Sequence, residues 1–166
     1  MATISFKKTS DYYRKLQELG EIAEKGEIIR DAVRAGAEPV ADAIRKHIEQ
    51  LPEQDFQRLP EGERFKGISG SQKEDLLDSF GLAPIQVGRN GFVHTKAGFD
   101  GYGSFPTPTY PQGVPNQLLA AAVESGSSVR QKTPFIAPAV KETRNESITA
   151  MEAEIDDEMK KIFEGG

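Results

Sequence analysis

Histidine moves protons and binds metals near neutral pH, and this chain has only two histidines, His47 and His94. The chain has no cysteine, which excludes thiolate metal ligands, disulfides and thiol nucleophiles. His47 falls beside the apolar face of a predicted helix, and His94 falls on a predicted hairpin. There is no HExxH motif and no histidine pair at helical spacing. Surface or interface histidines are therefore favoured over a zinc site, and we expect no bound metal.

A group of carboxylates near the C-terminus could serve acid–base chemistry if it were buried. Adjacent helical residues point in different directions, and the lysines that follow lie where the helix dipole favours cations. This pattern is typical of a solvated helix face. The residues are Glu154, Asp156, Asp157 and Glu158, followed by Lys160 and Lys161.

Two loop motifs lack the residues that chemistry would need. Gly88-Arg89-Asn90-Gly91 has neither the Lys-Ser/Thr ending nor the strand-to-helix context of a phosphate loop, and no serine lies in a G-x-S-x-G elbow. Tyr102, Phe105 and Tyr110 alternate with prolines and could stack bases, but no lysine or arginine lies nearby. Packing against a neighbouring subunit is favoured for these aromatics. We predict no catalytic residues, no cofactor and no enzymatic activity.

The length and composition of the chain favour one soluble domain over residues 1–166. The net charge of −5 provides no basic surface for sequence-specific nucleic-acid binding. No apolar run approaches the roughly 20 residues of a membrane span, and the N-terminus lacks a signal-peptide pattern. The absence of cysteine suits a reducing compartment.

Helical periodicity dominates both ends of the chain. Cap-type residues before Tyr12 predict a first helix over residues 11–19. A long stripe then predicts a second helix ending at Pro52, with Pro39 producing a kink or break near Ala35. A C-terminal amphipathic helix is predicted from about Pro138 to just before Gly165. The two stripes are Ile29, Val33, Gly36, Val40, Ile44, Ile48 and Leu51, and Ile148, Met151, Ile155, Met159 and Ile162.

The middle of the chain predicts a short helix, a hairpin and two loops. Ser71 and Glu74 have capping-box spacing before a helix that Gly81 ends. The Asn90-Gly91 pair between alternating apolar residues indicates a hairpin, whose second strand extends toward Phe99. Residues 53–70, which are charged and glycine-rich, and residues 103–115, which are rich in proline, are predicted loops. The fold class is therefore α+β: a small antiparallel sheet packed against a long kinked N-terminal helix, with a C-terminal amphipathic helix.

The segment from Leu118 to Val140 has the most defined local shape. An apolar run reaches a Gly/Ser break at residues 125–128, and Pro134 then forces Thr133 into extended conformation. Pro138 suits the first turn of a helix. Phe135, between the two prolines, is predicted to be a buried core plug beneath the terminal helix.

Three segments, in order, resemble the tail-component family of long-tailed bacteriophages, also described as phage morphogenesis or tail-completion proteins. They are the helix ending at Pro52, the Gly70–Phe80 segment entering a hairpin, and a C-terminal motif. That motif joins Val123-Glu124-Ser125-Gly126-Ser127-Ser128 to Pro134-Phe135-Ile136-Ala137-Pro138-Ala139 before one helix. The family more often has threonine at position 127 and an apolar or basic residue at position 137. The 53–70 and 103–115 loops resemble insertions, so their contacts do not carry over.

The resemblance implies a structural virion protein of the neck or head-proximal tail end, assembled in the bacterial host cytoplasm. It implies a homo-oligomeric ring, a hexamer, that joins or completes the tail and continues the DNA channel. Its partners would be copies of itself, neck or connector proteins, and tail-tube or terminator proteins. DNA would pass through the lumen without sequence-specific contact, and no membrane is involved. The candidate subunit-interface residues are Glu124, Ser125, Gly126, Ser127, Ser128 and Arg130.

The sequence leaves alternative functions open. Within the virion, the protein could be a tail terminator that caps the tail tube. More remote alternatives are a small intracellular enzyme, which would need polar residues converging on a pocket, and a DNA-binding regulator, which the negative charge disfavours.

Overall fold

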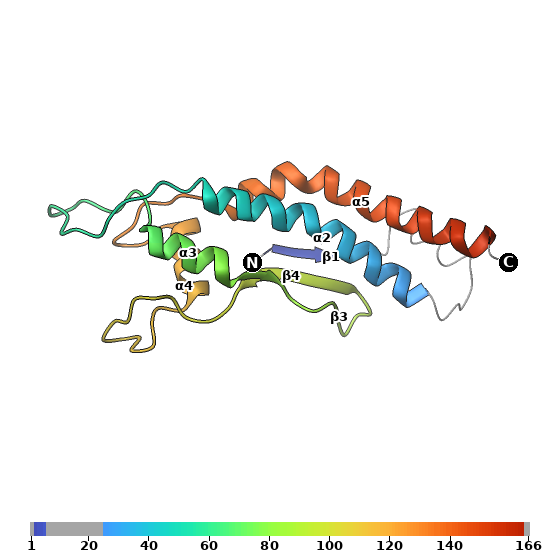
Figure 1. Cartoon of the computed structure of the whole chain (residues 1–166), viewed down its shortest axis with the longest axis horizontal. Coiled ribbons are helices and arrows are strands. Elements are labelled where there is room, and N and C mark those ends of the chain that lie inside the picture. The colour runs from blue at the N-terminus through green and yellow to red at the C-terminus, as the bar shows by residue number, and fades with distance from the viewer. Residues whose placement is uncertain (1, 6–24, 165–166) are drawn as a thin grey trace. The chain divides into compact units, whose positions relative to one another are not determined.

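A computed structural model describes residues 2–5 and 25–164 of the chain (Figure 1). The helix predicted over residues 11–19 lies outside this range. The described part is α+β, as predicted: four helices and a small antiparallel sheet. In chain order the elements are β1 (Ala2–Ser5), α2 (Lys25–Glu49), α3 (Gly70–Ser79), β2 (Phe80–Leu82), β3 (Gln86–Val87), β4 (Val93–Phe99), α4 (Asn116–Ser125) and α5 (Ile136–Glu164).

The described chain divides into two compact units, and each draws on separate stretches of sequence. The first unit combines residues up to 41 with residues 82–97 and 143 onward. The second combines residues 42–81 with residues 98–142. The expectation of a single domain stays a prediction.

Helix α2 follows its predicted stripe closely. Val33, Ile44 and Ile48 are almost completely buried, and Gly36 is buried among them. The helix runs unbroken through Pro39, so a break near Ala35 is wrong and a kink there stays a prediction. Pro39 lies far enough into the helix to remove one backbone donor, yet the continuous apolar stripe on both sides of it is buried, and that burial favours a continuous helix.

The sheet is organised around β4. β1 pairs antiparallel with β4, from Ala2 opposite Ala97 to Ser5 opposite His94, and the strand order is β1-β4-β2. β3 also pairs with β4, and Gly88 and Gly91 close the turn between them, which confirms the predicted hairpin. Buried and more exposed residues alternate along β4, so one face of the strand contributes to the core. Its buried residues are Val93, Thr95, Ala97 and Phe99.

The buried face of α5 differs from the predicted one. Met151 and Ile155 are buried as expected, but Ile148 is 45% exposed. The buried stripe instead steps by four through Ala139, Thr143, Ser147, Met151 and Ile155. A stripe chosen by hydrophobicity alone misses it, because two of its members are small polar residues.

Ser147 shows why a polar residue can occupy that stripe. Its hydroxyl donates to the carbonyl of Gly36 at 2.6 Å, so the buried oxygen has a partner. A Cβ atom at Gly36 would lie 2.4 Å from Cε of Met151. Within the first unit, α2 and α5 therefore approach closely at a glycine, whose missing side chain leaves room for Met151.

Helix α3 begins two residues earlier than predicted. The cap is Ser69, not Ser71: the Ser69 hydroxyl accepts from the Gln72 amide at 3.2 Å, and the Gln72 side chain accepts from the Ser69 amide at 3.3 Å. Ser69-Gly70-Ser71-Gln72 satisfies the capping-box pattern as well as Ser71–Glu74 does. Ser69 is 8% exposed whereas Ser71 is exposed, so burial selects the earlier register.

The 53–70 loop is fixed at its base. The Gln54 amide donates to the Ile68 carbonyl at 2.8 Å, and the Ile68 amide donates to the Pro52 carbonyl at 2.9 Å. On its other side, Phe65 exchanges two backbone hydrogen bonds with the segment around Arg130. The loop therefore emerges from a hydrogen-bonded base, and residues 55–64 form its exposed end.

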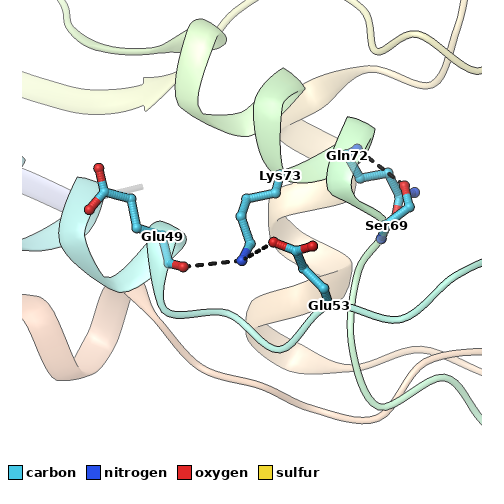
Figure 2. Close-up of polar contacts among 5 residues, drawn as sticks. All are labelled: Glu49, Glu53, Ser69, Gln72 and Lys73. Carbon is cyan, nitrogen blue, oxygen red and sulfur yellow. Dashed lines mark hydrogen bonds and ion pairs between the residues drawn. The ribbon is translucent and has the colours of Figure 1, made fainter.

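A lysine also ties the two ends of this region together (Figure 2). Lys73 Nζ donates to the carbonyl of Glu49 at 3.1 Å and pairs with Glu53 at 2.8 Å. Glu49 is the last residue of α2, so the ammonium lies where the helix dipole favours a cation. One side chain thus stabilises the end of α2, the start of the loop and the first turns of α3.

Candidate functional site

The motif that carries the family resemblance lies in the second unit, where α4 turns into α5. Helix α4 ends at Ser125, and Gly126 follows with φ of 81°, a conformation that glycine adopts without strain. The Gly126 amide donates to the Ala122 carbonyl, and the Ser127 amide donates to the Arg130 carbonyl. The chain then returns along α4, since the Thr133 amide donates to the Val123 carbonyl at 2.8 Å. The Gly/Ser break is a defined turn.

Glu124 joins the two pieces of the motif. Its carboxylate accepts hydrogen bonds from the amides of Phe135 at 2.7 Å, Ile136 at 2.8 Å and Ala137 at 2.9 Å. These amides belong to the start of α5, where backbone donors have no partner within the helix. The negative charge also lies at the positive end of the helix dipole. Glu124 therefore caps α5 from the preceding helix.

This cap explains the spacing of the motif. The capping residue and the capped helix are separated by a turn of fixed length, and Pro138 lies in the first turn of α5, where its missing amide is not needed. The predicted helix start near Pro138 is therefore two residues late, because α5 begins at Ile136.

Phe135 is buried, with 1% of its surface exposed, which agrees with its prediction as a core plug. Its ring lies edge-on to Phe99, with centroids 6.1 Å apart, and Phe99 in turn contacts Phe80 at 5.3 Å. These aromatic contacts all lie within the second unit. Phe135 therefore anchors the start of α5 in the core of that unit.

Arg130 was predicted at a subunit interface, but its guanidinium is used within the chain. Arg130 is 7% exposed and donates to the Gly67 carbonyl and, at 3.1 Å, to Oε1 of Gln72. Both acceptors are uncharged, and burial lowers the pKa of the guanidinium. The space beside it, bordered by Ile68 and Val123, has no volume that a water could enter. Arg130 therefore fixes the base of the 53–70 loop.

The six predicted interface residues thus separate into two groups. Glu124, Gly126 and Arg130 have roles inside the chain, and the Ser127 hydroxyl accepts from the Val129 amide at 3.3 Å. Ser125 and Ser128 are exposed, as is Val129 between Ser128 and Arg130, at 62%. A contact between subunits through this turn stays a prediction, and the exposed residues are the ones available for it.

The two histidines belong to different units and have different hydrogen-bond partners. His47 Nε2 lies 3.1 Å from a carboxylate oxygen of Glu142 in the second unit, whereas His94 lies on β4 and contacts the Phe92 carbonyl at 3.4 Å. Among the residues that the structure describes, no group of three or more His, Cys, Asp or Glu side chains could hold a metal ion. In the same part of the chain, no helix is long and apolar enough to cross a membrane.

The acidic group on α5 is at least partly exposed, as its sequence pattern indicates. Asp157 is exposed, and Asp156 and Glu158 are half-buried. Glu158 pairs with Lys161 one turn later and raises the pKa of that lysine.

The second unit contains an aromatic cluster that the sequence does not predict. Phe56 contacts Phe65 and Phe105 edge-on, with ring centroids 5.5 and 5.6 Å apart. Of the three, only Phe105 stands out in the sequence, because of its proline-rich surroundings. Phe56 lies 49 residues before Phe105 in the sequence, and no local pattern indicates that the two loops meet.

Comparisons with known proteins do not identify a relative. No family model, no curated protein and no solved structure matches the chain.

Proposed function

We propose that this protein is a structural component of a phage neck or head-proximal tail end. In this role its copies form a ring that joins or completes the tail and continues the DNA channel. The proposal rests on the resemblance of three sequence segments to tail-completion proteins. It assigns the protein to virus particles assembled in a bacterial cytoplasm.

The observation that carries the proposal is the Glu124 junction. The resemblance depends on two short pieces, one containing Glu124 and the other containing Phe135, at a defined separation. In this chain the separation has a physical purpose, because three amides at the start of α5 bind the Glu124 carboxylate. Because the spacing has a structural basis, a chance match to the family motif is less expected than it would be for two unrelated short segments.

The surface of the second unit supports an assembly role over a catalytic one. Large apolar side chains are exposed on it, including Phe56, Tyr102 and Val129. Phe56 also contacts the exposed Phe105, and contiguous exposed apolar surface is typical of protein contacts. Ser125, Ser128 and Val129 are the proposed ring contacts from the α4–α5 turn.

The proposal is tested by deleting the gene from the phage genome and examining the particles by electron microscopy. A neck or tail-completion protein predicts full heads and separate tails, with infectivity restored by the wild-type gene in trans. Tails of uncontrolled length would favour the tail-terminator alternative. Normal, infectious particles would contradict both.

The acidic group on α5 offers a finer test of the channel. If Asp156, Asp157 and Glu158 line the lumen in the ring, replacing all three by lysine should impair DNA delivery by particles that still assemble, since cations would hold the passing phosphates. Unchanged delivery would place these residues on an outer surface.

A further inference from the structure

The Phe56–Phe65–Phe105 cluster leaves aromatic surface uncovered. Phe56 is 49% exposed and Phe105 is 41% exposed, while Phe65, which contacts Phe56, is half-buried. Single exposed apolar residues are ordinary on soluble proteins, but a contiguous exposed cluster marks an interaction site.

The cluster is held in place by the bases of both loops. Phe65 is fixed by backbone hydrogen bonds to Val129 and Gln131, at 2.9 and 2.8 Å. The 103–115 loop is closed by a bond from the Gly103 amide to the Val114 carbonyl at 2.8 Å. Thr107 and Tyr110 exchange two further backbone bonds at its tip. A surface that is ordered before binding loses less conformational entropy on association.

The composition around the cluster indicates a protein partner. Residues 103–115 contain no charged side chain, although 28% of the whole chain is charged. Aromatic enrichment and charge depletion characterise the centre of protein interfaces. A nucleic acid would instead need a cationic surface.

The charges beside the cluster indicate which protein binds it. The exposed segment 55–66 carries three acidic and three basic side chains, and all six residues are exposed. A partner whose surface carries charges of one sign would meet like charges here. A second copy of the same segment instead offers positive and negative charges in equal number. The residues are Asp55, Glu61 and Glu63, and Arg58, Arg64 and Lys66.

The geometry points to a self-contact: the Phe56–Phe65–Phe105 cluster and the surrounding 55–66 segment bind the same surface of a second copy of this chain. A surface that is complementary to itself pairs two copies about a twofold axis. This contact differs in kind from the head-to-tail contact that closes a ring, and it does not depend on the proposed function.

The first test measures the association of the full-length protein by sedimentation velocity over a range of concentrations. The wild type is expected to form a concentration-dependent pair. The double variant Phe56→Ser/Phe105→Ser should weaken the pair at least about tenfold, because buried aromatic anchors dominate interface energies. Ile148→Ser is the matched control, since Ile148 is 45% exposed but lies in the first unit. It should leave association unchanged.

The second test uses the balanced charges and does not remove the aromatic surface. Glu61→Lys/Glu63→Lys and Arg58→Glu/Lys66→Glu each give a segment dominated by one sign, so each variant alone should pair weakly. Mixing the two should restore pairing as a heterodimer, which native mass spectrometry resolves if one variant is isotopically labelled. Circular dichroism checks that both variants are folded.

Three results would overturn the inference. The first is a wild-type protein that stays monomeric at the highest concentrations reached, and the second is unchanged pairing in the folded Phe56→Ser/Phe105→Ser variant. The third is failure of the mixed charge variants to associate. Because a ring would be closed by a different contact, a ring that persists in the double phenylalanine variant would leave this inference and the proposed function both standing.

Discussion

Two regions of the second unit use their side chains in opposite ways. At the α4–α5 junction, the Glu124 carboxylate and the buried Arg130 guanidinium bind partners within the chain, and Phe135 is covered. In the aromatic cluster, Phe56 and Phe105 touch each other yet keep nearly half of their surface exposed. The comparison separates residues that hold the fold from residues that are available to a partner. Changes at the junction should therefore alter stability, and changes in the cluster should alter association.

The largest effect is expected from Phe135→Ala. Removing a fully buried phenylalanine leaves a cavity against Phe99 and should lower the free energy of unfolding by about 3–5 kcal/mol. Urea denaturation followed by circular dichroism measures the change. Phe135→Leu is the control, because it keeps most of the apolar volume and should cost less. A near-neutral alanine variant would remove the core role of Phe135.

Gly113→Ala should disturb the base of the aromatic loop. Gly113 has φ of 106°, and a Cβ atom there would lie 1.9 Å from the Gly103 carbonyl oxygen. The backbone must shift, at a cost of about 1–3 kcal/mol, and the cluster should lose its fixed position. The matched control is Gly62→Ala, since Gly62 also has positive φ but no atom within 4 Å of the added carbon. Equal thermal stability of the two variants would contradict the close contact.

Glu124→Ala should have a smaller effect, of about 1–2 kcal/mol. It leaves three amides at the start of α5 without their acceptor and removes a negative charge from the helix N-terminus. Glu124→Gln keeps one acceptor oxygen and should retain part of the stability. Glu146→Ala, at an exposed position of α5, controls for the loss of one negative charge. If Glu124→Ala and Glu146→Ala unfold at the same urea concentration, the cap contributes nothing.

The smallest effect on stability is expected in the aromatic cluster. Phe56→Ser should change the free energy of unfolding by about 0.5 kcal/mol or less, as exposed substitutions generally do, while weakening self-association. Measuring unfolding and association on the same sample separates the two effects. A large loss of stability would mean that Phe56 belongs to the core, and the contrast between the two regions would then fail.

Much of the fold follows from the sequence because local patterns determine it. The α2 stripe, the Asn90-Gly91 hairpin and the burial of Phe135 each depend on spacing or on neighbouring residues. Where alternatives of similar local strength exist, burial decides between them, as it does between Ser69 and Ser71 for the α3 cap. The buried stripe of α5 was missed because Ser147 is buried through a hydrogen bond to Gly36, which is distant in sequence.

The site could be predicted less completely for the same reason. The motif from Glu124 to Phe135 is visible as a pattern, but the cap itself depends on a turn that brings α4 back to α5. The sequence places Arg130 in an exposed turn, and the side chain becomes a buried donor only because the 53–70 loop supplies the Gly67 carbonyl and α3 supplies Gln72. The Phe56–Phe105 contact joins two loops that no periodicity connects.

The most direct test of the proposed function is electron microscopy of particles made by a phage that lacks this protein. A neck or tail-completion role predicts DNA-filled heads and separate tails, which join into infectious particles when the wild-type protein is supplied. Intact, infectious particles in its absence would contradict a role in the neck or in tail completion.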